Sequence, residues 1–164
     1  MPLPARVRES RLANINPTEE VHVPARGIHH VDLTVSDVAR SISFYTRLLG
    51  PLGFEEYGRY PSYRGTEEVV YFDFGRQQFG LRLADGGEHR YYDVGIEHIA
   101  FFVDTREEVD DAYQRCLAMG ANVHHRPELD RDIEDYYALF VFDPDGIRVE
   151  IACASSVDRF EIGS

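Results

Sequence analysis

Two histidines and one glutamate stand at positions where their side chains are suited to bind a divalent metal ion. His30 lies in the segment HHVDLTV, His98 in the segment EHIAFFV, and Glu150 in the segment IRVEIA. Two imidazoles and one carboxylate form a facial set of ligands that holds a divalent metal and leaves other coordination positions open. The sequence therefore suggests a metal site, provided that the fold brings these three residues together.

The elements that must position these residues recur along the chain with a step of 68 residues. This step separates His30 from His98 (98 − 30 = 68), and it also separates the blocks that begin at residues 45 and 113 and at residues 69 and 137. Three blocks that keep one spacing indicate an internal duplication. The two histidines thus occupy equivalent places in two similar halves.

The order of elements follows from the sequence patterns within each half. Apolar and polar residues alternate in HHVDLTV, which indicates a strand with one buried face. A helix follows in each half: Thr105 and Glu108 form a capping-box pattern before the second helix, Gly120 ends it, and Ser36 is the expected N-cap of the first. Three strands come next, and the turn sequence DPDG joins the last two strands of the second half.

These elements predict an α+β protein of two tandem βαβββ modules that form a curled mixed sheet around a cleft, with the helices on the outer face. Module one spans about residues 27–86 and module two about residues 95–155. Residues 1–26 are predicted to be an N-terminal arm, because they hold four of the eight prolines and show little periodicity. Residues 156–164 are predicted to be a C-terminal tail.

Strand parity predicts which polar side chains share a face of the sheets. In the last strand of module two, Val149 and Ile151 are expected to face the helix, which leaves Arg148 and Glu150 on the opposite face. The same reasoning adds to that opposite face His30, Asp32, Arg82 and His98.

Structural roles without a metal are open for the same residues. Arg82 lies one repeat step before Glu150 (150 − 82 = 68), and an ion pair between them would compensate the carboxylate. His29 has the opposite parity and is expected to be structural, and of the adjacent His124 and His125 at most one is expected to face the cavity. The acidic stretch 128–135 is either a solvated loop or a lid over the cavity.

Composition excludes several classes of function. The formal charge of −12 disfavours nucleic acid and anionic membranes as partners. The chain has no lysine, which excludes a Schiff-base lysine and a phosphate-binding loop of the Walker type. Its two cysteines are too few for a four-thiolate zinc site, and no stretch approaches the roughly 18 consecutive apolar residues of a transmembrane helix. A cytoplasmic protein is expected.

The sequence resembles the vicinal oxygen chelate superfamily, which includes glyoxalase I, extradiol dioxygenases, methylmalonyl-CoA epimerase, fosfomycin-resistance thiol transferases and bleomycin-resistance proteins. The resemblance is carried by GIHHVDLTVSDVARSISFYTRLLGPLGF, IEHIAFFVD and FDPDGIRVEI, and it covers about residues 27–154. It implies paired βαβββ modules around a metal-binding cleft. It also implies that His30 and His98 are the first-strand ligands of the two modules and that Glu150 is the last-strand carboxylate.

Three positions depart from the patterns of particular members. Arg82 stands where glyoxalase I and the epimerase have a fourth ligand, and a guanidinium cannot ligate a metal. Phe140 stands ten residues before Glu150, where the extradiol dioxygenases usually have a tyrosine. The potassium loop of the fosfomycin transferases contains lysine, which this chain lacks.

The resemblance implies a metal-dependent enzyme that acts on a small oxygenated substrate through Fe, Mn, Zn or Ni held by His30, His98 and Glu150. Dioxygenation is the first expectation for its reaction, and a lyase or isomerase reaction is the second. Arg82 would anchor a carboxylate or phenolate, and Asp32 and Arg148 would serve in proton transfer or ligand orientation.

Two other functions remain open at this point, a metal-free protein of the bleomycin-resistance type that sequesters a ligand and a structural module with an empty cleft. A homodimer is expected, because two-module members of the superfamily commonly dimerise to complete the cavity. The arm at residues 1–26 is expected to cover the partner or the dimer seam, with Leu12 or Ile15 buried.

Overall fold

The computed structural model of the chain describes residues 28–65, 67–74 and 77–154. The predicted arm at 1–26, with Leu12 and Ile15, and the predicted tail at 156–164 lie outside these described residues. Within the described residues, no helix is long and apolar enough to cross a membrane.

Module one contains one helix, one short 3-10 turn and four strands. In chain order these are β1 (His30–Val35), α1 (Val38–Leu49), η1 (Gly50–Leu52), β2 (Glu55–Pro61), β3 (Glu68–Phe74) and β4 (Gln77–Leu83). The strands hydrogen-bond in the order β1-β4-β3-β2, with β1 parallel to β4 and the other pairs antiparallel.

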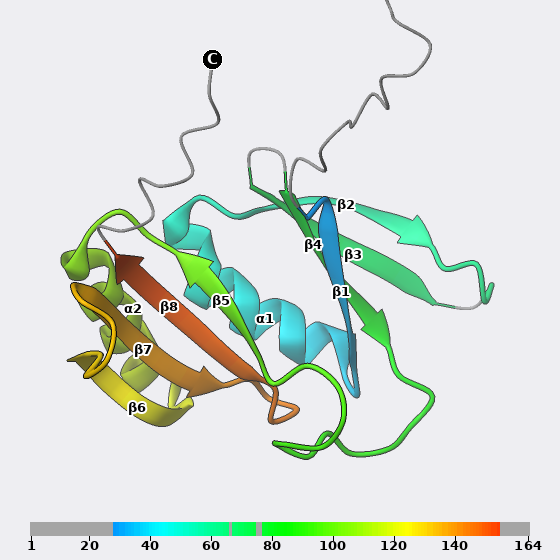
Figure 1. The fold of residues 1–164 in the computed structure, drawn as a ribbon. Helices are drawn as coiled ribbons and strands as arrows, with labels where there is room; N and C mark the ends of the chain where they lie inside the picture. Colours follow the sequence, from blue (N-terminus) through cyan, green and yellow to red (C-terminus); the bar gives the residue numbers. More distant parts are fainter. Residues whose placement is uncertain (1–27, 66, 75–76, 155–164) are drawn as a thin grey trace, which may run out of the picture.

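Module two repeats this arrangement. Its elements are β5 (His98–Phe102), α2 (Arg106–Met119), β6 (Asn122–Leu129), β7 (Tyr136–Phe142) and β8 (Arg148–Ala154). The strand order β5-β8-β7-β6 matches that of module one, and the only parallel pair of this sheet is β5 with β8. The predicted α+β class and the tandem βαβββ modules are thus confirmed, and the described strands form two sheets of four (Figure 1).

One hydrophobic core joins the two modules. Buried residues of both modules belong to this core, and α1 of module one contacts α2 of module two. Phe101 of β5 packs edge to face against Phe54 and Phe79 of module one, with ring centroids 5.2 and 5.7 Å apart. These aromatic contacts stabilise the association of the two modules within one chain.

The two helices begin in different ways. Thr105 and Glu108 form the predicted capping box of α2, and Gly120 ends that helix in the left-handed conformation. The predicted N-cap of α1 is wrong by one residue, because the side chain of Asp37, not Ser36, accepts the hydrogen bond from the backbone N–H of Arg40. The hydroxyl of Ser36 instead donates to Asp145 in module two.

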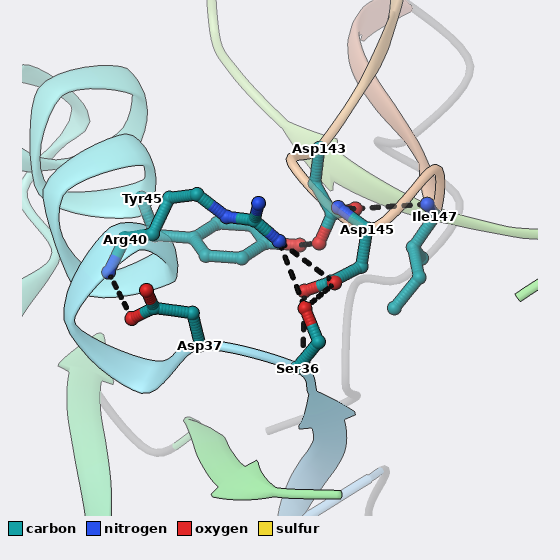
Figure 2. Close-up of polar contacts among 7 residues, drawn as sticks. All are labelled: Ser36, Asp37, Arg40, Tyr45, Asp143, Asp145 and Ile147. Atoms are coloured by element: carbon teal, nitrogen blue, oxygen red, sulfur yellow. Dashed lines mark hydrogen bonds and ion pairs between the residues drawn. The ribbon is translucent and has the colours of Figure 1, made fainter. Parts of the chain in front are cut away.

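A polar seam ties the start of α1 to the turn between β7 and β8, as Figure 2 shows. The hydroxyl of Tyr45 donates to Asp143 at 2.9 Å, and the guanidinium of Arg40 donates to Asp145 at 3.0 Å. Asp143 also accepts the backbone N–H of Ile147 at 2.8 Å, which closes the turn. The turn that leads into β8, and so toward Glu150, is therefore fixed by the helix of the other module.

Candidate functional site

His98 and Glu150 lie on hydrogen-bonded neighbouring strands. The register of β5 and β8 places His98 opposite Arg148 and Ala100 opposite Glu150. Val149 and Ile151, which alternate with Glu150, are fully buried in the core. His98 and Glu150 therefore share the face of the sheet that turns away from α2, as strand parity predicts.

The buried side chain of Glu150 contacts the partly exposed side chain of His98. Nε2 of His98 lies 3.0 Å from Oε2 of Glu150, and only 2% of Glu150 is exposed. The other oxygen, Oε1, accepts a hydrogen bond of 2.6 Å from the hydroxyl of Tyr136. Burial and this hydrogen bond raise the pKa of Tyr136 above its ordinary value. A buried carboxylate is stabilised by hydrogen-bond donors or by a cation, and here Tyr136 provides a donor on one oxygen while the other oxygen faces His98.

A second carboxylate holds the opposite side of the His98 ring. Nδ1 of His98 contacts the carboxylate of Glu97, which also accepts a hydrogen bond of 2.6 Å from the guanidinium of Arg148. These hydrogen bonds, first that to His98 and then that to Arg148, lower the pKa of Glu97. A carboxylate on Nδ1 fixes the ring orientation and favours the tautomer whose Nε2 lone pair is free to bind a metal.

Arg148 is fixed between two aromatic rings. Its guanidinium carbon lies 5.0 Å from the ring centre of Tyr91 and 4.7 Å from that of Phe140. The side chain is 13% exposed, and one guanidinium nitrogen approaches Nδ1 of His98 to 3.1 Å. The geometry thus brings Arg148 into contact with His98 and Glu97.

Arg82 belongs to a separate cluster in module one. Its Nε donates to Asp32 at 2.7 Å, and its Nη2 donates to the hydroxyl of Tyr71 at 3.0 Å. The hydrogen bond with Asp32 is the main cause of a raised pKa of Arg82. The ion pair of Arg82 with Glu150 that the sequence left open does not occur among the described residues, because Arg82 pairs with Asp32 and Glu150 contacts His98, each within its own module.

The register of the two sheets also changes which residue is the counterpart of Glu150. His30 pairs with Gln78 and His98 pairs with Arg148, so β4 and β8 are offset by 148 − 78 = 70 residues rather than 68. The position equivalent to Glu150 is therefore Gly80 (150 − 80 = 70), which pairs with Asp32 as Glu150 pairs with Ala100. A Cβ atom on Gly80 would lie 2.8 Å from Cε1 of Tyr71 and closer still to Oδ1 of Asp32. Asp32 and Tyr71 thus occupy the space that a carboxylate side chain fills in module two.

His30 is exposed at the start of the edge strand β1. Its Nδ1 lies 3.0 Å from Nδ1 of His29, and its ring stands edge to face with Tyr71, with centroids 6.2 Å apart. His30 and His98 both line a cavity of about 410 Å³ between the starts of β1 and β5. However, no group of three His, Cys, Asp or Glu side chains among the described residues is close enough to hold a metal ion. The structure brings His98 and Glu150 together and leaves His30 apart from them.

The donor atoms of His98 and Glu150 fit one side of a divalent metal site. An imidazole nitrogen and a carboxylate oxygen face each other from adjacent strands, and no arginine is among the described contacts of the buried carboxylate. A metal ion bound to both atoms would compensate the negative charge of the carboxylate. His30 has the right chemistry for a third ligand.

The remaining predicted residues differ in part from expectation. His124 and His125 both pack on the cavity face of β7, with ring centroids 5.0 Å from Phe142 and 6.1 Å from Phe140. The prediction that at most one of them faces that side is wrong, because the register of β6 shifts between Val123 and His125 and breaks the alternation. The acidic stretch forms the end of β6 and the turn before β7.

Two site residues were missed in the sequence. Glu97 precedes His98 directly, and Tyr136 lies fourteen residues before Glu150 rather than ten. Hairpin register provides a signal for Tyr136, because Tyr136, Ala138 and Phe140 alternate onto the face that carries Glu150.

Comparison with known proteins identifies relatives over most of the chain. A family model described as the Glyoxalase/Bleomycin resistance protein/Dioxygenase superfamily matches residues 27–151. Metallothiol transferase FosB of Staphylococcus haemolyticus is 28% identical over 134 residues, which cover 82% of this chain and 88% of that protein. Lactoylglutathione lyase of Salmonella typhimurium is 30% identical over 132 residues, which cover 79% of this chain and 94% of the lyase.

Solved structures share the fold at lower identity. The fosfomycin resistance protein FosX of Listeria monocytogenes, in complex with Mn(II) and a sulfate ion, superimposes with a TM-score of 0.61 and 19% identity. The match covers 84% of this chain and 100% of the FosX chain. At this identity the likeness shows a common fold.

Proposed function

The chain belongs to the glyoxalase, bleomycin resistance protein and dioxygenase superfamily, and we propose that it is an enzyme that uses a divalent metal ion held by His98, Glu150 and His30. The observation that carries the proposal is the 3.0 Å approach of His98 Nε2 to Oε2 of the buried Glu150. An ion at this place would act as a Lewis acid toward a small oxygenated substrate.

A second copy of the chain supplies His30 in this proposal. Within one chain His30 stands apart from the other two ligands, although all three lie on the cavity faces of their sheets. The strands β1 and β5 that carry the two histidines are both edge strands, so another chain can approach them. Each dimer then holds two sites, and each site takes His98 and Glu150 from one copy and His30 from the other.

The residues around the ligands have separate tasks in the proposal. Glu97 and Arg148 hold the ring of His98 so that Nε2 points at the ion. Arg82 spends its Nε and Nη2 donors on Asp32 and Tyr71, so its Nη1 donors are proposed to bind a substrate carboxylate or phenolate. Asp32 keeps Arg82 in place and reduces its net positive charge, so the substrate is held by directed hydrogen bonds more than by long-range attraction.

Lewis-acid chemistry is favoured over dioxygenation by the environment of Phe140. This residue stands where extradiol dioxygenases usually carry a tyrosine, and its ring packs on Arg148 and offers no hydroxyl. The named relatives are a thiol transferase and a lyase. We therefore favour an addition, lyase or isomerase reaction, and oxygen consumption with iron(II) and a catechol is the observation that would reverse this preference.

Complementation between two inactive variants tests both the ligands and the second copy. Protein purified without a His tag is titrated with Mn(II), and His30→Ala and Glu150→Ala are each expected to bind none stoichiometrically. Mixing the two variants after mild unfolding and refolding should restore one site per mixed dimer, because one of its two sites then has all three ligands. A wild-type protein without stoichiometric metal binding would support the ligand-sequestering alternative, and variants that stay inactive after mixing would place all ligands in one chain.

A further inference from the structure

We infer that Tyr136 is a positioning residue that presents a single oxygen of Glu150 to the metal, an inference that rests on the proposed function. The Tyr136 hydroxyl donates to Oε1 of Glu150 at 2.6 Å, while Oε2 faces Nε2 of His98 at 3.0 Å. The two carboxylate oxygens thus have separate partners. No conformational change is needed for Oε2 and Nε2 to meet one ion.

The backbone before Tyr136 is built to hold this hydroxyl in place. The carboxylate of Asp130 accepts the N–H groups of Asp132 and Ile133, each at 2.8 Å, and the N–H of Asp130 donates to the carbonyl of Tyr136, also at 2.8 Å. Asp135, directly before Tyr136, has a left-handed φ of 58° and forms an ion pair with Arg106 of α2. The acidic turn is therefore a closed structure rather than a loose loop, and Tyr136 begins β7 at its end.

A hydrogen bond on Oε1 has a definite consequence for metal binding. A phenol is protonated at neutral pH and can only donate to a carboxylate, so it competes with any metal for Oε1. Glu150 then binds through Oε2 alone, and one imidazole with one carboxylate oxygen from this chain occupies two coordination positions. The remaining positions stay open for His30 of the second copy and for substrate oxygens.

Tyr136 also separates Glu150 from a neighbouring cavity. A cavity of about 310 Å³ is lined by Tyr136, His125 and Phe140 together with residues of the acidic turn. Glu150 itself is almost fully buried beneath this surface. Loss of the hydroxyl would let the carboxylate rotate toward the cavity and turn Oε2 away from Nε2 of His98.

The adjacent tyrosine provides a matched control. Tyr137 points to the other face of β7 and donates its hydroxyl to Asp110 of α2 at 2.8 Å. Tyr136→Phe and Tyr137→Phe therefore each remove one phenolic oxygen bound to one carboxylate, and only the first touches Glu150. A general effect of the lost hydrogen bond on stability is common to both variants.

The experiment compares Mn(II) binding by competition with a chelator and the electron paramagnetic resonance spectrum of bound Mn(II). Tyr136→Phe is expected to bind Mn(II) about 10–100-fold more weakly and, at saturation, to show a changed zero-field splitting. Tyr137→Phe should match the wild type within about twofold in affinity and show the same spectrum. Asp130→Ala leaves Tyr136, His98 and Glu150 unchanged but removes the hydrogen bonds that close the turn, so it should also weaken Mn(II) binding. This variant replaces Tyr136→Phe in the test if circular dichroism shows that Tyr136→Phe is unfolded.

The outcomes separate this inference from the proposed function. Wild-type affinity and spectrum in folded Tyr136→Phe would overturn the positioning role while leaving the metal site intact, and so would wild-type affinity in Asp130→Ala if Tyr136→Phe does not fold. Equal weakening in Tyr136→Phe and Tyr137→Phe would overturn it as well, because the effect would then be structural. A wild-type chain that binds no Mn(II) would overturn both.

Discussion

Substitution of Gly80 by alanine tests the packing of Asp32 and Tyr71 over Gly80, the position in module one that corresponds to Glu150 in module two. The added Cβ atom would lie 2.8 Å from Cε1 of Tyr71 and closer still to Oδ1 of Asp32, distances that real Cβ atoms do not show. Asp32 must therefore move by about 1 Å, since ordinary contacts of this kind begin near about 3.4 Å. That movement breaks its 2.7 Å hydrogen bond from Arg82 and the 3.3 Å hydrogen bond from Tyr71.

The expected loss follows from these contacts. A hydrogen bond between charged groups contributes about 1.5–3 kcal/mol to stability. The lower half of this range applies here, because the Arg82 and Asp32 side chains are 26% and 20% exposed and water screens their interaction. Replacing glycine by alanine also stabilises the folded chain by about 0.4–1 kcal/mol, because alanine lowers the conformational entropy of the unfolded chain. The free energy of unfolding should fall by about 0.5–2 kcal/mol, which lowers the melting temperature of a chain of this size by about 1–8 °C.

Urea unfolding followed by circular dichroism measures this change, because the chain has no tryptophan to report by fluorescence. Gly50→Ala is the matched control, since a Cβ there meets no atom within 4 Å and the φ of −54° suits alanine. It should be as stable as the wild type or more so. In an Asp32→Ala background the Gly80→Ala penalty should shrink by at least about 0.5 kcal/mol. Equal stability of Gly80→Ala and Gly50→Ala would refute the reasoning.

Three further predictions concern other parts of the fold. Thr105→Ala removes the capping box of α2 and should lower the free energy of unfolding by about 0.5–2 kcal/mol in a urea titration. Thr46→Ala, on the exposed face of α1, should leave the free energy of unfolding unchanged, and equal effects of the two variants would contradict the prediction. Burial raises the pKa of the Cys116 thiol to about 11. Ellman's reagent should therefore modify the partly exposed Cys153 first and Cys116 only when the chain unfolds. Equal rates of modification of the two cysteines would be evidence against the buried position of Cys116. Burial also raises the pKa of Asp143 above 3.8, so the folded chain holds its proton more tightly than the unfolded chain. The stability that this shift contributes is fully present below the pKa of Asp143 in the unfolded chain, and it is lost as the pH rises through the pKa of Asp143 in the folded chain. The free energy of unfolding of the wild type, relative to that of Asp143→Asn, should therefore grow as the pH falls from about 7 to 3. A difference that stays constant with pH would contradict this.

Much of the fold was predictable because it follows from local patterns. The capping box at Thr105 and Glu108 and the left-handed Gly120 depend only on residues within one helix, and both are confirmed. The faces of β8 follow from the alternation of Val149 and Ile151 with Glu150, because a strand in a two-layer core has one apolar side.

The errors arise where distant residues decide a local choice. Ser36 is a good N-cap residue, yet its hydroxyl is taken by Asp145, 109 positions away, and Asp37 caps the helix instead. The repeat step of 68 fails at β4 and β8, because the segment between β7 and β8 is longer than the one between β3 and β4. The local sequence predicts neither the hydrogen bond from Ser36 to Asp145 nor the offset of 70 residues between equivalent positions of β4 and β8.

The corrected register gives the two modules complementary roles at the proposed site. Module two places an imidazole and a carboxylate oxygen within 3.0 Å of each other, and module one fills the equivalent space with the Asp32, Tyr71 and Arg82 cluster over Gly80. A second carboxylate at position 80 would bring another negative charge to an ion that needs open positions for substrate. Glycine at that position instead lets Asp32 fix a guanidinium whose free N–H groups can bind an anionic oxygen. In the proposed function, module two would therefore supply two of the metal ligands, His98 and Glu150, while module one would supply His30 and the guanidinium of Arg82 that binds the substrate.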